Sequence, residues 1–198
     1  MKIIKTIALI ALILTLSSCM TANYTKPNHK DTKDNYSVTV HNDFDAVWKQ
    51  LIQYSASTFF AIDNYEKDSG LITLSFGSSN PSDFITGGHW KASSPTINFD
   101  GDYVDYMAIH NNGSLSGKMN IVVTEISKNE SAVKVNARYI FTTPTQRTQY
   151  AVVPGTTWSF DTGNCNTSVV SNPSSGTGNT RTICPTYKAE NAIINAVK

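Results

Sequence analysis

The chain has 198 residues, 16 basic against 15 acidic side chains, and a charged content of 16%, below the roughly 25% of an average soluble domain. This near balance excludes the broad basic surface that nucleic-acid binding requires. The length suits one domain once a targeting segment is removed, and the polar, uncharged composition favours a β-rich extracytoplasmic protein.

The first residues have the layout of a secretory signal. Lys2 and Lys5 precede a compact apolar run, which is shorter than the roughly 20 residues of a permanent membrane helix. The run ends in Leu16-Ser17-Ser18-Cys19, which resembles a bacterial lipobox. We therefore predict a lipoprotein signal peptide over 1–18 and lipidation of Cys19. The alternative is a plain signal peptide or an anchor helix that happens to end at this cysteine.

The residue that follows the predicted cleavage site and Cys19 indicates a cellular location. Met20 follows the lipidated cysteine, and by resemblance to enterobacterial sorting rules it favours the outer membrane, facing the periplasm. The inner membrane and the cell surface are the alternatives. Removing 1–18 removes only Lys2 and Lys5 among the charged residues, so 14 basic and 15 acidic side chains remain. The lipid is then the predicted contact with the membrane, because the sequence has no cluster of basic residues that would bind anionic lipids as well.

Residues 19–35 are polar, contain Pro27 and lack periodicity, which predicts a flexible tether. The alternating YSVTVH that begins at Tyr36 predicts a strand. Asn42 or Asp43 then caps an amphipathic helix, whose apolar positions recur with helical spacing in DFDAVWKQLIQYSAS.

The middle of the chain reads as strands. Segments 59–66 and 71–76 are predicted strands joined by a turn at Gly70, and 77–95 is rich in turn formers, with a Gly87-Gly88 pair. Partial alternation over 96–109 predicts one or two more strands. Strict alternation in SLSGKMNIVVTEIS and AVKVNARYIFTT predicts a hairpin with one buried face.

The last third contains one more strand and a helix. Segment 150–160 extends the sheet, with a bend at Pro154-Gly155. The final segment, TYKAENAIINAVK, has a narrow face of small and apolar residues and predicts a C-terminal helix.

With Cys19 assigned to lipid, Cys165 and Cys184 remain as an even pair for an oxidising compartment. The residues between them are rich in Ser, Asn, Gly and Thr, which predicts a hairpin over 165–184 closed by a disulfide. A reactive thiol pair or a metal site is the competing interpretation, but neither cysteine lies in a CxxC motif and no histidine is near either one in the sequence.

The order of elements predicts a single α+β domain over 36–198. A curved antiparallel sheet packs against a C-terminal helix in a helix-grip-like arrangement, with an N-terminal amphipathic helix after the first strand. The run DFDAVWKQLIQYSASTFFAIDNYEKDSGLITLSF, within Tyr36 to Phe76, resembles the repeating unit of BamC-like envelope lipoproteins. There a Trp-bearing helix is followed by a strand, an acidic turn with Gly, and a second strand. The resemblance implies a fold and an envelope location and carries no catalytic residues.

No catalytic constellation is evident in the sequence. A Gly-x-Ser-x-Gly elbow is absent. The best metal-ligand set is His89 and His110 with the acidic residues Asp83, Asp100, Asp102 and Asp105, but loop aspartates are more often turn formers. We therefore predict no metal, no cofactor and no catalytic residue.

Three functions are compatible with these features. The first is a lipid-anchored, periplasm-facing accessory or scaffold protein of the cell envelope, in contact with a larger envelope complex and without catalytic activity. The alternative is a binder of a small apolar ligand in a cavity between the sheet and the C-terminal helix, where Ala189, Ala192 and Ala196 leave room. The third is a metal-dependent enzyme that uses His89 and His110.

Overall fold

The computed structural model describes residues 21–94, 97–147, 152–172 and 177–198. In chain order the elements are β1 (Thr21–Thr25), η1 (Lys33–Asn35), β2 (Ser37–Val40), α2 (Phe44–Ser57), β3 (Ala61–Glu66), β4 (Leu71–Ser78), η2 (Pro81–Asp83), β5 (Ile85–Thr86), β6 (His89–Ser93), β7 (Asn98–Asp102), α3 (Tyr103–Asn111), β8 (Ser114–Ser127), β9 (Glu130–Thr143), β10 (Gln146–Arg147), β11 (Val152–Val153), β12 (Thr156–Asp161), β13 (Asn166–Asn172), β14 (Thr177–Pro185) and α4 (Lys188–Val197).

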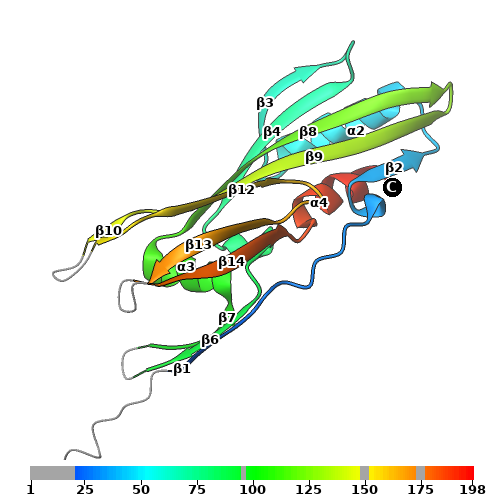
Figure 1. The fold of residues 1–198 in the computed structure, drawn as a ribbon. Helices are drawn as coiled ribbons and strands as arrows, with labels where there is room; N and C mark the ends of the chain where they lie inside the picture. The colour runs from blue at the N-terminus through cyan, green and yellow to red at the C-terminus, as the bar shows by residue number, and fades with distance from the viewer. Residues whose placement is uncertain (1–20, 95–96, 148–151, 173–176) are drawn as a thin grey trace, which may run out of the picture.

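A six-stranded antiparallel sheet organises the fold (Figure 1). Its order is β12-β9-β8-β4-β3, and β2 pairs with β9 beyond the end of β12. The long β8–β9 hairpin is the one that strict alternation predicts. Every second residue of both strands is buried along most of their length, for example Met119 and Val135, while Lys118 and Arg138 lie on the exposed face. The sheet therefore has one apolar face that needs a cover.

Two helices cover that face. Helix α2 buries Val47, Trp48 and Leu51, and its N-cap is the predicted Asp43, whose carboxylate accepts a hydrogen bond from the Ala46 N–H. Helix α4 contacts α2 and strand β9. The α+β class, the N-terminal helix after an early strand and the C-terminal helix against the sheet are confirmed.

The rest of the chain forms smaller sheets at one end of the molecule. Strands β1-β6-β7 form one three-stranded sheet, β13-β14-β5 form another, and β10 pairs with β11. Figure 1 shows these strands and α3 at the end opposite the C-terminus, which lies beside α4.

The prediction of strands over 96–109 is wrong for its second half. Strand β7 ends at Asp102, and α3 follows at once. The Asp102 carboxylate caps this helix by accepting a hydrogen bond from Val104 N–H. Tyr103, Val104 and Met107 are buried on one face of the helix, but apolar residues also lie off this face, for example the exposed Ile109, so the sequence shows no clear amphipathic pattern. The local cap outweighs the weak alternation that favoured a strand.

The predicted tether also differs from expectation over its described part. Residues 21–25 form β1 and pair antiparallel with β6, with Tyr24 opposite Trp90. Gly88 explains how the segment fits so closely. Its φ is +78°, and a Cβ there would collide with the backbone carbonyl of Thr25. The Gly87-Gly88 pair thus permits the close approach of another piece of backbone.

Candidate functional site

Cys19 and the predicted signal segment 1–18 lie outside the described residues. Lipidation therefore stays a prediction.

The predicted disulfide between Cys165 and Cys184 is present. Cys165 directly precedes β13 and Cys184 lies in β14, so the bridge closes the antiparallel hairpin at its base. Cys184 is buried and pairs with Thr86 of β5. The bridge therefore lies where the hairpin meets β5, the short strand that follows β4. In the loop-entropy model, a cross-link over a loop of this length stabilises the folded protein by about 3 kcal/mol.

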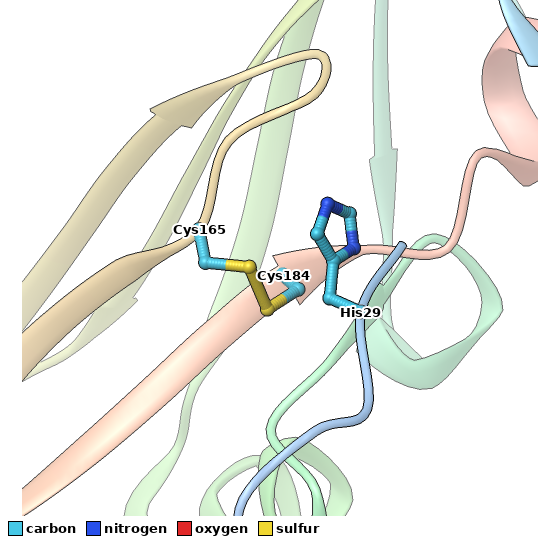
Figure 2. Close-up of side chains that lie close together, drawn as sticks. All are labelled: His29, Cys165 and Cys184. Carbon is cyan, nitrogen blue, oxygen red and sulfur yellow. A yellow bond between two sulfur atoms is a disulfide. The ribbon is translucent and has the colours of Figure 1, made fainter. Parts of the chain in front are cut away.

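His29 lies beside this bridge (Figure 2). A ring nitrogen and the two sulfur atoms lie within 4.8 Å of one another, and this is the one group of metal-ligand type found among the described residues. Metal binding by cysteine needs thiolates, whereas these sulfurs are joined to each other. The arrangement is therefore a cross-link with a neighbouring imidazole.

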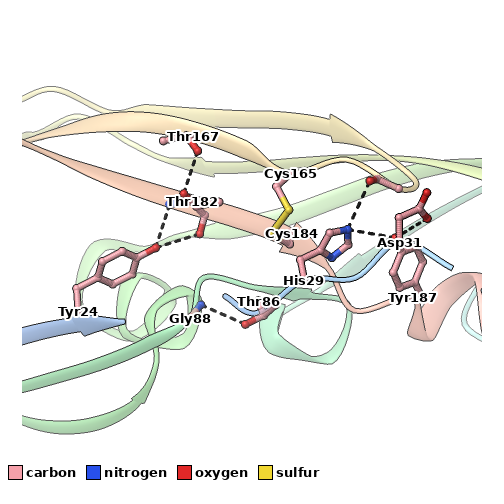
Figure 3. Close-up of a disulfide and its surroundings, with 11 residues drawn as sticks. Tyr24, His29, Asp31, Thr86, Gly88, Cys165, Thr167, Thr182, Cys184 and Tyr187 are labelled. Carbon is pink, nitrogen blue, oxygen red and sulfur yellow. Dashed lines mark hydrogen bonds between the residues drawn. A yellow bond between two sulfur atoms is a disulfide. The ribbon is translucent and has the colours of Figure 1, made fainter. Parts of the chain in front are cut away.

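His29 belongs to a polar cluster that holds the N-terminal segment against the domain (Figure 3). Its Nε2 lies 3.2 Å from the Tyr187 hydroxyl and 3.4 Å from the Gly163 carbonyl oxygen. The Tyr187 hydroxyl also donates to the Asp31 carboxylate at 3.1 Å, and the His29 and Tyr187 rings stack on each other. Burial, followed by the Asp31 carboxylate, raises the pKa of Tyr187, so its hydroxyl stays protonated and keeps donating.

The histidines and aspartates considered for a metal take other roles. His89 Nε2 pairs with Asp100 at 3.0 Å, while His110 is exposed and packs on the Tyr106 ring. Asp102 accepts hydrogen bonds from Gly87 N–H, Val104 N–H and the Thr86 hydroxyl. Asp83 and Asp105 line the same open hollow of about 430 Å³ as Asp100 and Asp102, but these carboxylates do not converge as ligands in the described chain.

The space between the sheet and α4 is filled by side chains. Ala189, Ile193 and Ile194 are fully buried there. Glu190 is buried too, and it accepts hydrogen bonds from Tyr139 at 2.5 Å and from Thr162 at 2.8 Å. Burial raises the pKa of Glu190, although both hydroxyls favour its ionised form. A carboxylate and its hydroxyl partners therefore lie buried beside α4, and these polar groups do not suit an apolar ligand.

A pocket of about 270 Å³ lies instead at the opposite end, where four segments meet. Trp90 of β6, Tyr103 and Tyr106 of α3, Pro154 after β11 and Arg181 of β14 line it. The other lining side chains are apolar or uncharged: Met107, Asn111, Thr143, Pro144, Gln146, Val153, Thr156, Val170 and Asn179.

Arg181 is the centre of this pocket wall. Its guanidinium carbon lies 4.4 Å from the ring centre of Tyr24, 4.9 Å from that of Trp90 and 5.3 Å from that of Tyr103. Such stacking holds a cation by cation–π attraction. The Tyr24 hydroxyl accepts from Thr182 N–H at 3.0 Å, which fixes this ring beside β14 (Figure 3).

The charge of Arg181 has no carboxylate partner in the described part of the chain. The Arg181 Nε–H and the Trp90 indole N–H are both buried and lack a hydrogen-bond acceptor among the described residues. Burial raises the pKa of Tyr103 to about 12, so this hydroxyl adds no negative charge at neutral pH. The described pocket wall therefore carries one cation and no carboxylate.

Sequence reasoning missed this site because its parts are far apart in the chain. Tyr24 lay in a predicted tether, Trp90 in a turn-rich segment and Arg181 in the disulfide hairpin. The available signal was the Gly-Gly pair beside Trp90, which marked a close approach of backbone without saying which segment approaches.

No protein-family model matches the chain, and no curated protein or solved structure is significantly similar to it. The resemblance of Tyr36 to Phe76 to BamC-like units therefore stays a prediction. None of the helices in the described ranges is long and apolar enough to cross a membrane.

Proposed function

We propose that this chain is a lipid-anchored accessory protein of the bacterial envelope, held in the outer membrane through Cys19 and facing the periplasm. It acts by contacting other envelope components and has no catalytic activity. The lipobox-like stretch Leu16 to Cys19 carries this proposal. The disulfide supports it, because such bridges persist in oxidising compartments outside the cytoplasm.

The hydrogen bonding of the histidines supports a role without catalysis. In the described ranges, no histidine hydrogen-bonds the side chain of a serine, threonine or cysteine, which a nucleophile with an adjacent base would show. His89 does pair with Asp100, but both side chains are about half exposed. This pair is solvated on the surface of the β6–β7 strands.

We also propose the finer helix-grip-like description of the fold, and kinship with BamC-like units. The first is supported by the packing of α4 on β9, and the second by the strand–helix–strand–strand order of β2, α2, β3 and β4. A helix-grip sheet curves around its terminal helix, so a crystal structure with a flat sheet would contradict that description.

The anchor is tested by Cys19→Ser in growing cells labelled with palmitate, followed by detergent phase separation. The native protein is expected to be labelled, cleaved and recovered in the detergent phase, whereas the variant is expected to be neither labelled nor cleaved at residue 19. The double variant Cys165→Ser/Cys184→Ser is the matched control and should keep its label. A labelled, cleaved Cys19→Ser protein would overturn the proposed anchor.

The accessory role is tested by crosslinking in intact cells, followed by purification of the native lipidated protein. A defined set of envelope proteins crosslinked to this chain is expected. Recovery of only uncrosslinked monomer in several detergents would contradict the role while leaving the anchor untouched.

A further inference from the structure

We propose that the pocket around Arg181 binds a small carboxylate with a compact apolar body, whose carboxylate faces Arg181 and whose body lies against the aromatic wall. The proposal rests on this pocket alone, so it holds or fails independently of the lipid anchor.

The charge of the lining selects an anion. Arg181 is the only charged residue among the described residues that line the pocket, and a guanidinium stays protonated at every physiological pH. A cationic ligand would meet a like charge, and the rings that might hold it already stack on Arg181. A carboxylate would supply the counter-charge that the described chain does not provide.

The donors of the guanidinium select a ligand with acceptors. An Arg181 Nη1–H bonds the Thr180 carbonyl oxygen at 2.9 Å, whereas the Arg181 Nε–H and the Trp90 N–H have almost no accessible surface, so a ligand would meet the remaining guanidinium N–H groups, which can only donate. A carboxylate has two acceptor oxygens and a single charge, which matches one arginine. A phosphate carries more negative charge than this one cation can balance.

Size and surface select the body of the ligand. The volume of about 270 Å³ lies just under the usual range for small-molecule pockets, which excludes long acyl chains and large cofactors. Trp90, Tyr106 and Pro154 offer flat apolar surface, on which a ring or short branched chain would stack.

The direct test compares three probes with the same carbon skeleton on the full mature chain: 3-phenylpropionate, its neutral amide and 3-phenylpropylamine. Binding is followed by calorimetry and by tryptophan fluorescence. Trp90 lines the pocket and Trp48 does not, while the buried Trp158 donates its indole N–H to the Arg181 carbonyl oxygen and can also report on binding. The carboxylate is expected to bind about tenfold more tightly than the amide, because a charge-assisted hydrogen bond is the stronger one. The amine is expected not to bind.

Variants locate the site. Arg181→Gln should weaken carboxylate binding about tenfold or more and remove the preference over the amide. Arg138→Gln is the matched control, because this arginine lies on the exposed face of the sheet and pairs with Asp161. Its affinity should equal that of the native chain.

A second variant keeps the test decisive if Arg181→Gln fails to fold. Trp90→Phe retains a ring against the guanidinium but offers a smaller flat surface to the ligand body, so the affinities of the carboxylate and the amide should fall together by several-fold while the melting temperature changes little. The proposal is overturned if the native chain binds the amide as tightly as the carboxylate. It is also overturned if no carboxylate binding occurs at about 10 mM, or if a folded Arg181→Gln chain binds unchanged.

Discussion

The half of the molecule under α2 and α4 and the end around Arg181 are built by different means. The first is a regular sheet whose buried residues alternate and are covered by two helices, so neighbours in space are set by periodicity. The second is assembled from β1, the segment after β4 and the disulfide hairpin, which are far apart in the chain. It is held by an edge-to-face contact of two tyrosine rings, a close backbone contact at a glycine and a disulfide bond.

This difference predicts that the two regions contribute to different properties, one to stability and the other to binding. A regular hydrophobic sheet resists unfolding, because each buried residue contributes to one continuous core. The Arg181 end has unpaired donors and a pocket, which are features that a protein keeps at some cost to stability. We expect global stability to depend mainly on the first region and binding on the second.

The largest expected effect comes from emptying the core under α2. Leu51→Ala should lower the free energy of unfolding by about 2–5 kcal/mol, since this leucine is fully buried. Urea unfolding followed by circular dichroism measures it. Ile109→Ala, at a position 67% exposed on α3, should change stability by less than about 0.5 kcal/mol. If both variants lost the same free energy of unfolding, stability would not depend mainly on the core under α2.

The disulfide gives the next largest effect. Cys165→Ala/Cys184→Ala should cost about 3 kcal/mol in the loop-entropy model. Hydrogen exchange should show that amides of β13 and β14 lose protection while those of β8 and β9 keep it, because the bridge lies outside the large sheet. A uniform loss across both regions would mean that they unfold as one unit.

Removing a helix cap should cost less. Asp43→Ala leaves the Ala46 N–H without its acceptor and should lower stability by about 1 kcal/mol, whereas Asp43→Asn should stay near the native value. Asp102→Ala should cost more, because the same carboxylate also binds Gly87 N–H and the Thr86 hydroxyl. If the two alanine variants lost the same stability, the extra contacts of Asp102 would contribute nothing.

The smallest expected effect is a dependence on pH. Burial raises the folded-state pKa of Glu190 above its ordinary value of 4.5, so the folded chain binds a proton more tightly than the unfolded chain. Its contribution is fully present below about pH 4.5 and is lost as the pH rises through the folded pKa.

The Glu190→Gln variant isolates this contribution. Urea unfolding at several values between pH 4 and 8, roughly the range where carboxylates and histidines titrate, should show that the variant gains stability relative to the native chain as pH rises. A constant difference between the two chains would show that Glu190 does not titrate abnormally.

The regular half could be predicted from sequence, because alternation in 114–143 and helical spacing after Asp43 are local signals. The disulfide could be predicted too, because only two cysteines remained after Cys19. Helix α3 could not, since apolar residues such as the exposed Ile109 lie off its buried face and obscure the helical pattern, and an aspartate cap decides its start. The burial of Glu190 could not be predicted either, because nothing local reveals that Tyr139 and Thr162 will hydrogen-bond to it.

The candidate pocket could not be predicted for a related reason. Arg181 lies in a polar hairpin and Tyr24 in a stretch without periodicity, and each is ordinary in isolation. Their contact is created by the pairing of β1 with β6, which depends on register across more than 60 positions of chain. Long-range pairing of irregular segments leaves no pattern in a short window.

With the proposed anchor, strand β1 would also set the distance between the domain and the membrane. Cys19 precedes Thr21 by two residues, and two residues of extended chain reach at most about 7 Å. If Cys19 carries the lipid, the paired strand leaves no slack between bilayer and domain. The molecule would stand with the β1–β6 edge toward the lipid headgroups, and the direction from which a ligand or partner approaches would be fixed by strand register.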